Sequence, residues 1–192
     1  RTALTRARVR SAIILRKITR IFGPYYKLRE SEAGMEFPAT CLFAARSFGG
    51  KSTLIKWLTF RYLENWDWIV IISPTAAFNR EYDWIPERYR ISEYSDAVIL
   101  ELLRVQETSG RRLLLIVDDG LGSVDFKTQP WLRLSTTGRQ YRISLFIASQ
   151  FMHRLPNHLR MNAHYVCALK TTNDNEKKLL MNEYRIGLTK PQ

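Results

Sequence analysis

The residue types best suited to chemistry in this chain of 192 residues stand between positions 45 and 53. An apolar run over 40–44 precedes them, and an amphipathic stretch over 54–63 follows. This order predicts a buried strand, a glycine-rich loop and a helix, which is the context that a phosphate-binding loop requires. The predicted loop consists of Ala45, Arg46, Ser47, Phe48, Gly49, Gly50, Lys51, Ser52 and Thr53.

Each part of this loop has a physical task in binding a nucleotide. Gly49 and Gly50 allow backbone N–H groups to turn toward a phosphate, and the helix that begins at Lys51 adds the positive end of its dipole. We expect Lys51 to reach the β- and γ-phosphates of ATP and the Ser52 hydroxyl to ligate Mg²⁺. Ala45 stands where the common pattern has its first glycine, so we expect the loop to form provided that φ at Ala45 is negative.

A second chemical element is an acidic pair that follows the apolar run over 113–117. Asp118 and Asp119 come at the predicted carboxyl end of that strand, which lies beside the phosphate loop in a parallel α/β sheet. There Asp118 would help to hold Mg²⁺, and Asp119 would orient or deprotonate the attacking water. An acidic pair that only caps a strand before the 120–122 turn is the alternative interpretation.

A third apolar run, over 143–149, ends in the amide of Gln150. An amide at the tip of this strand can hydrogen-bond the γ-phosphate or the attacking water, and can so report hydrolysis to moving parts. A solvent-facing glutamine at the end of a strand is the alternative.

The positive charge of the chain is concentrated near its start. The formal net charge is +12, and residues 1–29 contain nine Lys or Arg and no Asp or Glu. This composition indicates a polyanionic partner, of which nucleic acid is the first candidate. The helical spacing of apolar residues over 2–22 predicts a basic helix that follows DNA phosphates, docks on a neighbouring subunit, covers a sheet edge or serves as a transit peptide. We divide the chain into a basic helix and connector, 1–37, and a P-loop ATPase domain, 38–192.

The composition bounds the class of protein. A hydrophobic content of 45% suits one α/β domain with a full core. No apolar run approaches the roughly 18 residues of a membrane span, so we expect no stable membrane association. Cys41 and Cys167 fall in predicted core strands, which favours buried thiols in a reducing compartment over a disulfide.

The remaining helices and strands are predicted from the periodicity of apolar residues and from the residues that begin or end helices. Strands are predicted over 68–73 and 165–170. A helix is predicted to begin near Ser92, as its N-cap, and to end at Ser109-Gly110. Further helices are predicted over 126–138, 156–162 and 174–184.

These motifs together resemble a known group of proteins. Ala45-x4-Gly50-Lys51-Ser52, the acidic strand over 115–119, the segment 138–144 that leads into Ala148-Ser149-Gln150, and Pro156-x3-Arg160-x-Asn162 form its signature. They are similar to the genome-packaging ATPases of poxvirus-type large DNA viruses and their smaller relatives, within the FtsK/HerA class of P-loop DNA motors. The resemblance covers roughly residues 38–170.

The resemblance implies a three-layer, RecA/ASCE-like P-loop NTPase fold. Its central, mostly parallel sheet is flanked by helices and has an additional strand between the phosphate-loop strand and the acidic strand. It also implies ATP and Mg²⁺ as cofactors, a homo-oligomeric ring of five or six subunits with ATP at the interfaces, and double-stranded DNA moved into a preformed capsid through its vertex. The infected host cell is then the expected location, in a cytoplasmic virus factory or the nucleus, with presence in the virion a further option.

Ring motors of this class also use an arginine from the neighbouring subunit to stabilise charge on the transferring phosphoryl group. Arg139 matches the family position best, Arg142 is second, and Arg46 is a candidate within the same subunit. For contact with DNA phosphates, the basic N-terminal segment, Arg154 and Arg160 are the candidates, and such contacts are sensitive to salt.

Two other functions remain open on sequence grounds. One is a P-loop kinase or nucleotide-handling enzyme, for which no arginine-rich lid segment is evident. The other is a membrane-associated ATPase for virion export, which would need a transmembrane segment outside these residues.

Overall fold

In the part of the chain that the structure describes, six strands form one sheet in which every neighbouring pair is parallel. The structure is a computed structural model that describes residues 34–169 and 173–184, apart from 77, 79 and 123. The strands lie in the order β3-β2-β4-β5-β1-β6. Their bounds are β1 Thr40–Ala44, β2 Trp68–Ile72, β3 Arg90–Ile91, β4 Leu113–Asp118, β5 Ile143–Ser149 and β6 Tyr165–Ala168.

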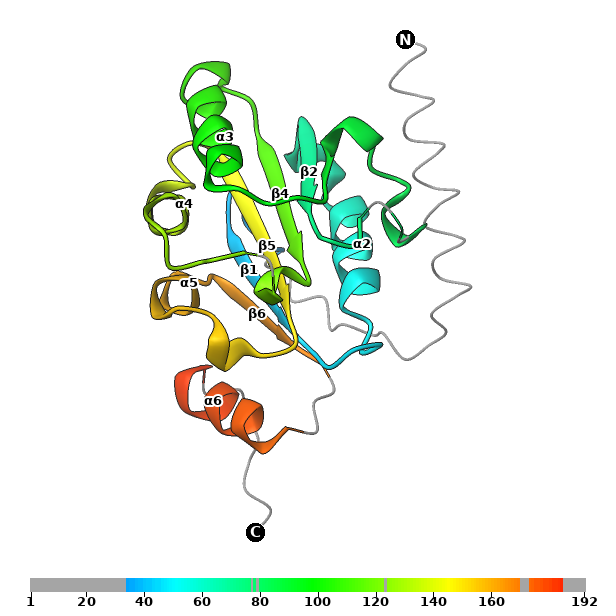
Figure 1. The fold of residues 1–192 in the computed structure, drawn as a ribbon, viewed down its shortest axis with the longest axis vertical. Helices are drawn as coiled ribbons and strands as arrows, with labels where there is room; N and C mark the ends of the chain where they lie inside the picture. The colour runs from blue at the N-terminus through cyan, green and yellow to red at the C-terminus, as the bar shows by residue number, and fades with distance from the viewer. Residues whose placement is uncertain (1–33, 77, 79, 123, 170–172, 185–192) are drawn as a thin grey trace.

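Helices cover both faces of this sheet, with α2 on one face and α3, α4 and α5 on the other (Figure 1). Their bounds are α2 Lys51–Arg61, α3 Asp96–Ser109, α4 Gln129–Thr137, α5 Asn157–Met161 and α6 Asp174–Tyr184. Short 3-10 turns are η2 Leu63–Asn65, η3 Arg80–Tyr82, η4 Glu87–Tyr89, η5 Gly120–Gly122 and η6 Met152–Arg154. The predicted three-layer α/β architecture is therefore confirmed.

Two apolar cores, one on each face of the sheet, explain why the sequences of the strands are continuous apolar runs. On the first face Ile55 of α2 belongs to the same cluster as Phe43 and Phe146. On the second face Trp131 of α4 belongs to the same cluster as Val117. Every residue of β4 and β5 is buried, as expected for parallel strands that are covered on both sides.

The order of the strands brings the predicted functional segments to one edge of the sheet. β5 lies between β1 and β4, which is the additional strand that the family resemblance implies. In the registers, Ala44 is opposite Ser149 and Asp118 is opposite Ala148. The phosphate loop, the acidic pair and Gln150 thus follow the carboxyl ends of three adjacent strands.

Some helix boundaries differ from those predicted. The N-cap of α3 is Ser95, with extended backbone angles, and not Ser92, because 90–91 pair with β2 as a short strand. Helix α4 begins at Gln129 rather than at 126. Pro130 therefore lies in the first turn of the helix, where backbone N–H groups have no partner within the helix and the missing N–H of proline costs nothing. Gly110 ends α3 in a left-handed conformation at φ 62, as predicted.

The two cysteines differ in their surroundings. Cys41 is fully buried in β1, whereas Cys167 is half-buried because β6 is an edge strand. Burial raises the pKa of both thiols, that of Cys167 to about 11. Both are free cysteines, as expected, but the prediction that both are buried in core strands is correct only for Cys41.

Two predictions concern the start of the chain and membranes. The predicted basic helix over 2–22 and most of the 1–37 segment lie outside the described residues. Every helix that the structure describes is too short or too polar to span a bilayer.

Candidate nucleotide-binding site

The glycine-rich loop joins β1 to α2 and has room for glycine alone at its turn. A Cβ built on Gly49 would lie 2.8 Å from both the Ala45 Cβ and the Arg46 carbonyl oxygen, and Gly50 has φ 84. Ala45 is not among the described residues with positive φ, so its methyl group is compatible with the loop, as expected. The loop therefore forms with alanine in the place of the first glycine.

The ammonium group of Lys51 hydrogen-bonds to the backbone of this loop. Its Nζ donates to the carbonyl oxygens of Ala45, at 3.0 Å, and Arg46, at 3.1 Å. Only 7% of Lys51 is exposed, and it makes no ion pair with any carboxylate of the described residues. A buried cation held by neutral carbonyls is ready to exchange them for phosphate oxygens.

The Asp118 carboxylate lies at the centre of the site and is 3% exposed. Its Oδ2 accepts hydrogen bonds from the Ser52 hydroxyl, at 2.9 Å, and from the hydroxyl of Tyr82. Its Oδ1 is buried and has no hydrogen-bond partner among the described residues. Burial is the largest influence and raises the pKa of Asp118, while Tyr82 and Ser52 act to lower it.

An unpartnered buried carboxylate oxygen next to a serine hydroxyl fits a divalent cation. Mg²⁺ is a hard cation that takes oxygen ligands and commonly binds through one or two carboxylates together with substrate phosphates and water. The side chains of Ser52 and Asp118, which the sequence predicts as the metal ligands, are brought together here.

The second acid and the predicted amide form a pair at the same edge. Asp119 has φ 53, a left-handed conformation, and its side chain is exposed while that of Asp118 is buried. Gln150 Nε2 donates to Asp119 Oδ1 at 3.4 Å. The two side chains predicted to act on water are therefore neighbours.

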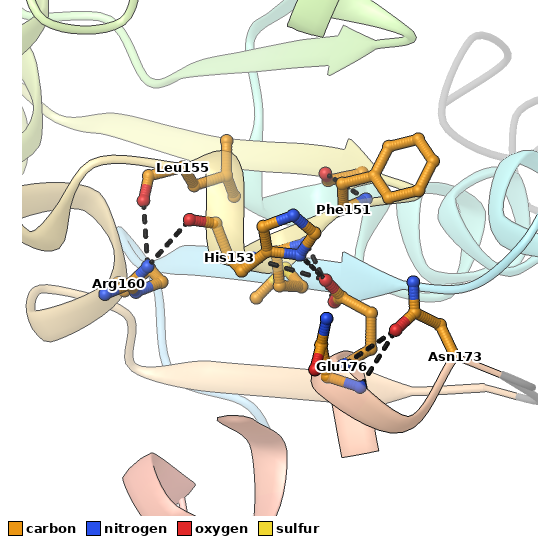
Figure 2. A network of polar contacts seen from close by, with 9 residues as sticks. Phe151, His153, Leu155, Arg160, Asn173 and Glu176 are labelled. Atoms are coloured by element: carbon orange, nitrogen blue, oxygen red, sulfur yellow. Dashed lines mark hydrogen bonds and ion pairs between the residues drawn. The ribbon is translucent and has the colours of Figure 1, made fainter. Parts of the chain in front are cut away.

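The segment after Gln150 is held by polar contacts from α6 and α5 (Figure 2). Glu176, 2% exposed on α6, accepts the backbone N–H of Met152 at 2.9 Å and also contacts the His153 ring nitrogen Nδ1. Arg160 Nη1 donates to the carbonyl oxygen of Leu155 at 3.0 Å. These contacts hold the backbone that follows the carboxyl end of β5, and so restrict the position of Gln150.

Comparison with known proteins identifies the family of this chain. A family model described as "Poxvirus A32 protein" matches residues 43–190. The chain belongs to this family. It is also 26% identical to the uncharacterized protein L437 of Acanthamoeba polyphaga mimivirus, in a match that covers 77% of this chain and 57% of that protein. The chain thus spans little more than half the length of that relative.

Solved structures with a similar fold are P-loop NTPases. The genome packaging NTPase B204 from Sulfolobus turreted icosahedral virus 2, in complex with ATP-gammaS, has a TM-score of 0.61 at 16% identity, over 78% of this chain and 83% of that one. Its complex with AMP has a TM-score of 0.64 at 15% identity, over 81% and 90%. The pCW3 conjugation coupling protein TcpA has a TM-score of 0.56 at 15% identity, over 76% and 52%.

These comparisons confirm two of the predictions. The match to the Poxvirus A32 protein family agrees with the resemblance to poxvirus-type packaging ATPases. The structural likeness, at such low identity, confirms the P-loop NTPase fold.

In this member of the family, Arg139 lies at the opposite edge of the sheet from the phosphate loop. Its Nη1 is 2.7 Å from Nε2 of His164, whose Nδ1 accepts the N–H of Thr40 at 3.1 Å. Thr40 begins β1 and the loop follows the end of β1, which at about 3.3 Å per residue separates the two by roughly 16 Å. Arg142 is at the same far edge, where it donates to the Gly110 carbonyl oxygen, so neither arginine reaches the loop of its own chain.

Arg46 and the two predicted DNA contacts have distinct surroundings. Arg46 is exposed within the loop, and Arg154 is exposed, with its guanidinium carbon 4.8 Å from the centre of the Phe151 ring. Arg160 was predicted to contact DNA, but its side chain is only 12% exposed and pairs with Glu183 at 3.0 Å. We correct that prediction, because its guanidinium is engaged in holding α5 and α6.

Two side chains of the site were not predicted to have a role. Tyr82 contacts Asp118 from a short loop after β2, and Glu176 holds the segment after Gln150 from α6. An aromatic residue in a polar loop is at most a weak signal in sequence. The role of Glu176 depends wholly on tertiary packing.

The raised pKa of Asp118 predicts how a neutral replacement changes stability. An unfolded aspartate has a pKa of about 3.9, and below that pH the carboxyl is protonated in both states. As pH rises above that value, the ionised carboxyl disfavours the folded state, so stability is lost up to the folded pKa. We expect Asp118→Asn to raise the free energy of unfolding relative to wild type, and to raise it more at pH 7 than at pH 4. Urea unfolding of both proteins, in EDTA and without nucleotide, measures this difference. An equal difference at both pH values would contradict the burial argument.

Proposed function

We propose that this chain is an ATP-hydrolysing motor that moves double-stranded DNA into a viral capsid and works as a ring of subunits. The observation that carries the proposal is the convergence of Lys51, Ser52 and Asp118 with the Asp119–Gln150 pair at one sheet edge, in a member of the Poxvirus A32 protein family. Support also comes from the likeness in fold to B204, a genome packaging NTPase solved with ATP-gammaS.

Binding of ATP is assigned to the loop and its flanking helix. The backbone N–H groups of residues 45–53 and the start of α2 would hold the phosphates, and Lys51 would leave its two carbonyl partners for the β- and γ-phosphates. Ser52 and Asp118 would hold Mg²⁺. Bound Mg²⁺ supplies charge neutralisation on the β- and γ-phosphate oxygens.

Hydrolysis is assigned to the exposed pair. Asp119 would accept a proton from the water that attacks the γ-phosphorus, as the bond to the β-phosphate oxygen breaks to give ADP and phosphate. Gln150 would orient that water or sense the γ-phosphate. Because the residues after Gln150 are tied to α6 through Glu176, loss of the γ-phosphate would be transmitted to that helix.

Completion of the site by a neighbour is assigned to Arg139. Its place at the far edge of the sheet excludes action on its own loop but suits a ring in which that edge faces the next subunit's nucleotide. A ring of five or six subunits is the arrangement that we propose. Arg142 at the same edge is the second candidate.

The proposed partners are double-stranded DNA and the capsid vertex, and the proposed location is the infected cell. The nine basic residues within 1–29 and the exposed Arg154 would contact phosphates without regard to sequence, since backbone contacts carry no base information. The place of action would be the cytoplasmic virus factory or the nucleus of the infected cell, with presence in the virion as a further option.

Replacement of Asp119 separates binding from hydrolysis. We expect Asp119→Asn to bind ATP nearly as wild type and to lower kcat by about 10²- to 10⁴-fold, the usual contribution of a general base. Lys51→Ala should instead lose nucleotide binding. Fluorescent-nucleotide titration and steady-state ATPase rates distinguish the two. Normal turnover by Asp119→Asn would show that this role is wrong.

Complementation tests the role of Arg139 across the interface. Arg139→Ala alone should lower kcat by about 10³-fold or more, as for other arginine fingers. Mixing it with Asp119→Asn should restore activity, because one subunit then supplies the intact site and the other the arginine. Arg142→Ala, mixed in the same way, is the matched comparison. A mixture that is no more active than its parts would contradict action in trans.

A further inference from the structure

Tyr82 is a fully buried tyrosine that no motif explains. It ends the η3 turn after β2 and is 0% exposed. Its ring belongs to the core cluster on the α2 face, together with Ile71 and Ile116. The hydroxyl, however, is directed to the nucleotide site, where it donates to Oδ2 of Asp118.

The contacts of the Asp118 carboxylate are divided unevenly between its two oxygens. Oδ2 accepts from both Tyr82 and Ser52, whereas Oδ1 is buried and has no partner among the described residues. Two donors on one oxygen hold the carboxylate plane and prevent its rotation. The other oxygen is then left with its lone pairs for a ligand from outside the chain.

Backbone and side-chain hydrogen bonds hold the turn that carries Tyr82. Ile85 N–H donates to the Tyr82 carbonyl oxygen at 2.9 Å. Arg90, in β3, donates through Nε to the Ile85 carbonyl oxygen at 2.6 Å and through Nη1 to Asp83 Oδ1 at 2.9 Å. The turn that carries Tyr82 is thereby tied to the sheet edge, since β3 pairs with β2.

We propose that Tyr82 is a positioning residue for the divalent cation of the nucleotide site. It holds the Asp118 carboxylate so that Oδ1 faces the metal, and it thereby sets the affinity of the site for Mg²⁺. Tyr82 is fully buried, and it acts through its hydrogen bond to Asp118. The inference rests on the proposed function, since it requires that this loop bind a metal–nucleotide complex.

Tyr82→Phe tests the inference because it removes the hydroxyl and keeps the ring. Partners behind a metal ligand typically contribute about 10- to 100-fold in affinity. We expect Mn²⁺ binding in the presence of AMPPCP, measured by electron paramagnetic resonance, to weaken within that range. In steady-state assays the Mg²⁺ concentration for half-maximal rate should rise, while kcat at saturating Mg²⁺ stays near wild type.

Tyr94→Phe is the matched control. The Tyr94 hydroxyl donates to a carboxylate oxygen of Asp96, so this variant loses the same kind of bond on the other face of the sheet. Its Mn²⁺ affinity should equal that of wild type. Thermal unfolding of both variants reports any general loss of stability, which would not produce a selective change in metal affinity.

The outcomes distinguish the inference from the function on which it rests. Wild-type chain that binds Mn²⁺ with AMPPCP, together with unchanged affinity in Tyr82→Phe, overturns the role of Tyr82 alone. A wild-type chain that binds neither Mn²⁺ nor AMPPCP overturns the proposed function, and this inference with it.

If Tyr82→Phe does not fold, the wild-type chain labelled with ¹³Cζ-tyrosine tests whether a tyrosine lies beside the bound metal, which the inference requires. Mn²⁺ with AMPPCP should then broaden a tyrosine signal by paramagnetic relaxation. Unbroadened signals from every tyrosine would overturn the inference.

Discussion

The carboxylate of Asp118, buried at the end of β4, is the constraint on which the rest of the site depends. An ionised group at this depth is costly unless hydrogen bonds or a cation compensate it. Ser52, from the first turn of α2, and Tyr82, from η3, both donate to one of its oxygens. The carboxylate therefore joins three segments that are far apart in sequence, and its second oxygen, which has no partner among the described residues, is where we propose that a cation binds. Without it, the side-chain link between α2, β4 and η3 would be lost, and the loop would be held to the sheet by the backbone pairing of β1 with β5.

The polarity of the parallel sheet distributes the functional groups between two edges. The six strands that the structure describes run in one direction. The loop, the acidic pair and Gln150 therefore share the carboxyl edge, while Arg139 and Arg142 share the amino edge. A chain with its proposed catalytic groups at one edge and candidate arginines at the other is suited to the head-to-tail assembly that we propose, in which each site is completed by the next subunit. Heterologous contacts of this kind generate rings when the rotation closes.

The fold could be predicted from sequence because its strands are covered on both faces and its turns need glycine. The apolar runs that end at Ala44, Val117 and Ser149 became strands with little change in their bounds, and Gly49 and Gly50 occupy positions where other residues clash or are strained. The contacts of Tyr82, Glu176 and Arg160 could not be predicted. Each joins residues distant in sequence, and neither composition nor spacing encodes which buried polar group meets which partner.

The most direct test of the account is the ATPase rate per chain, measured against protein concentration, with and without linear double-stranded DNA, at low and high salt. A ring completed by neighbouring subunits predicts a rate per chain that rises with concentration. It also predicts stimulation by DNA that weakens as salt increases, because phosphate contacts release counterions. A rate that is constant with concentration and indifferent to DNA would contradict the motor and would indicate a self-contained nucleotide enzyme.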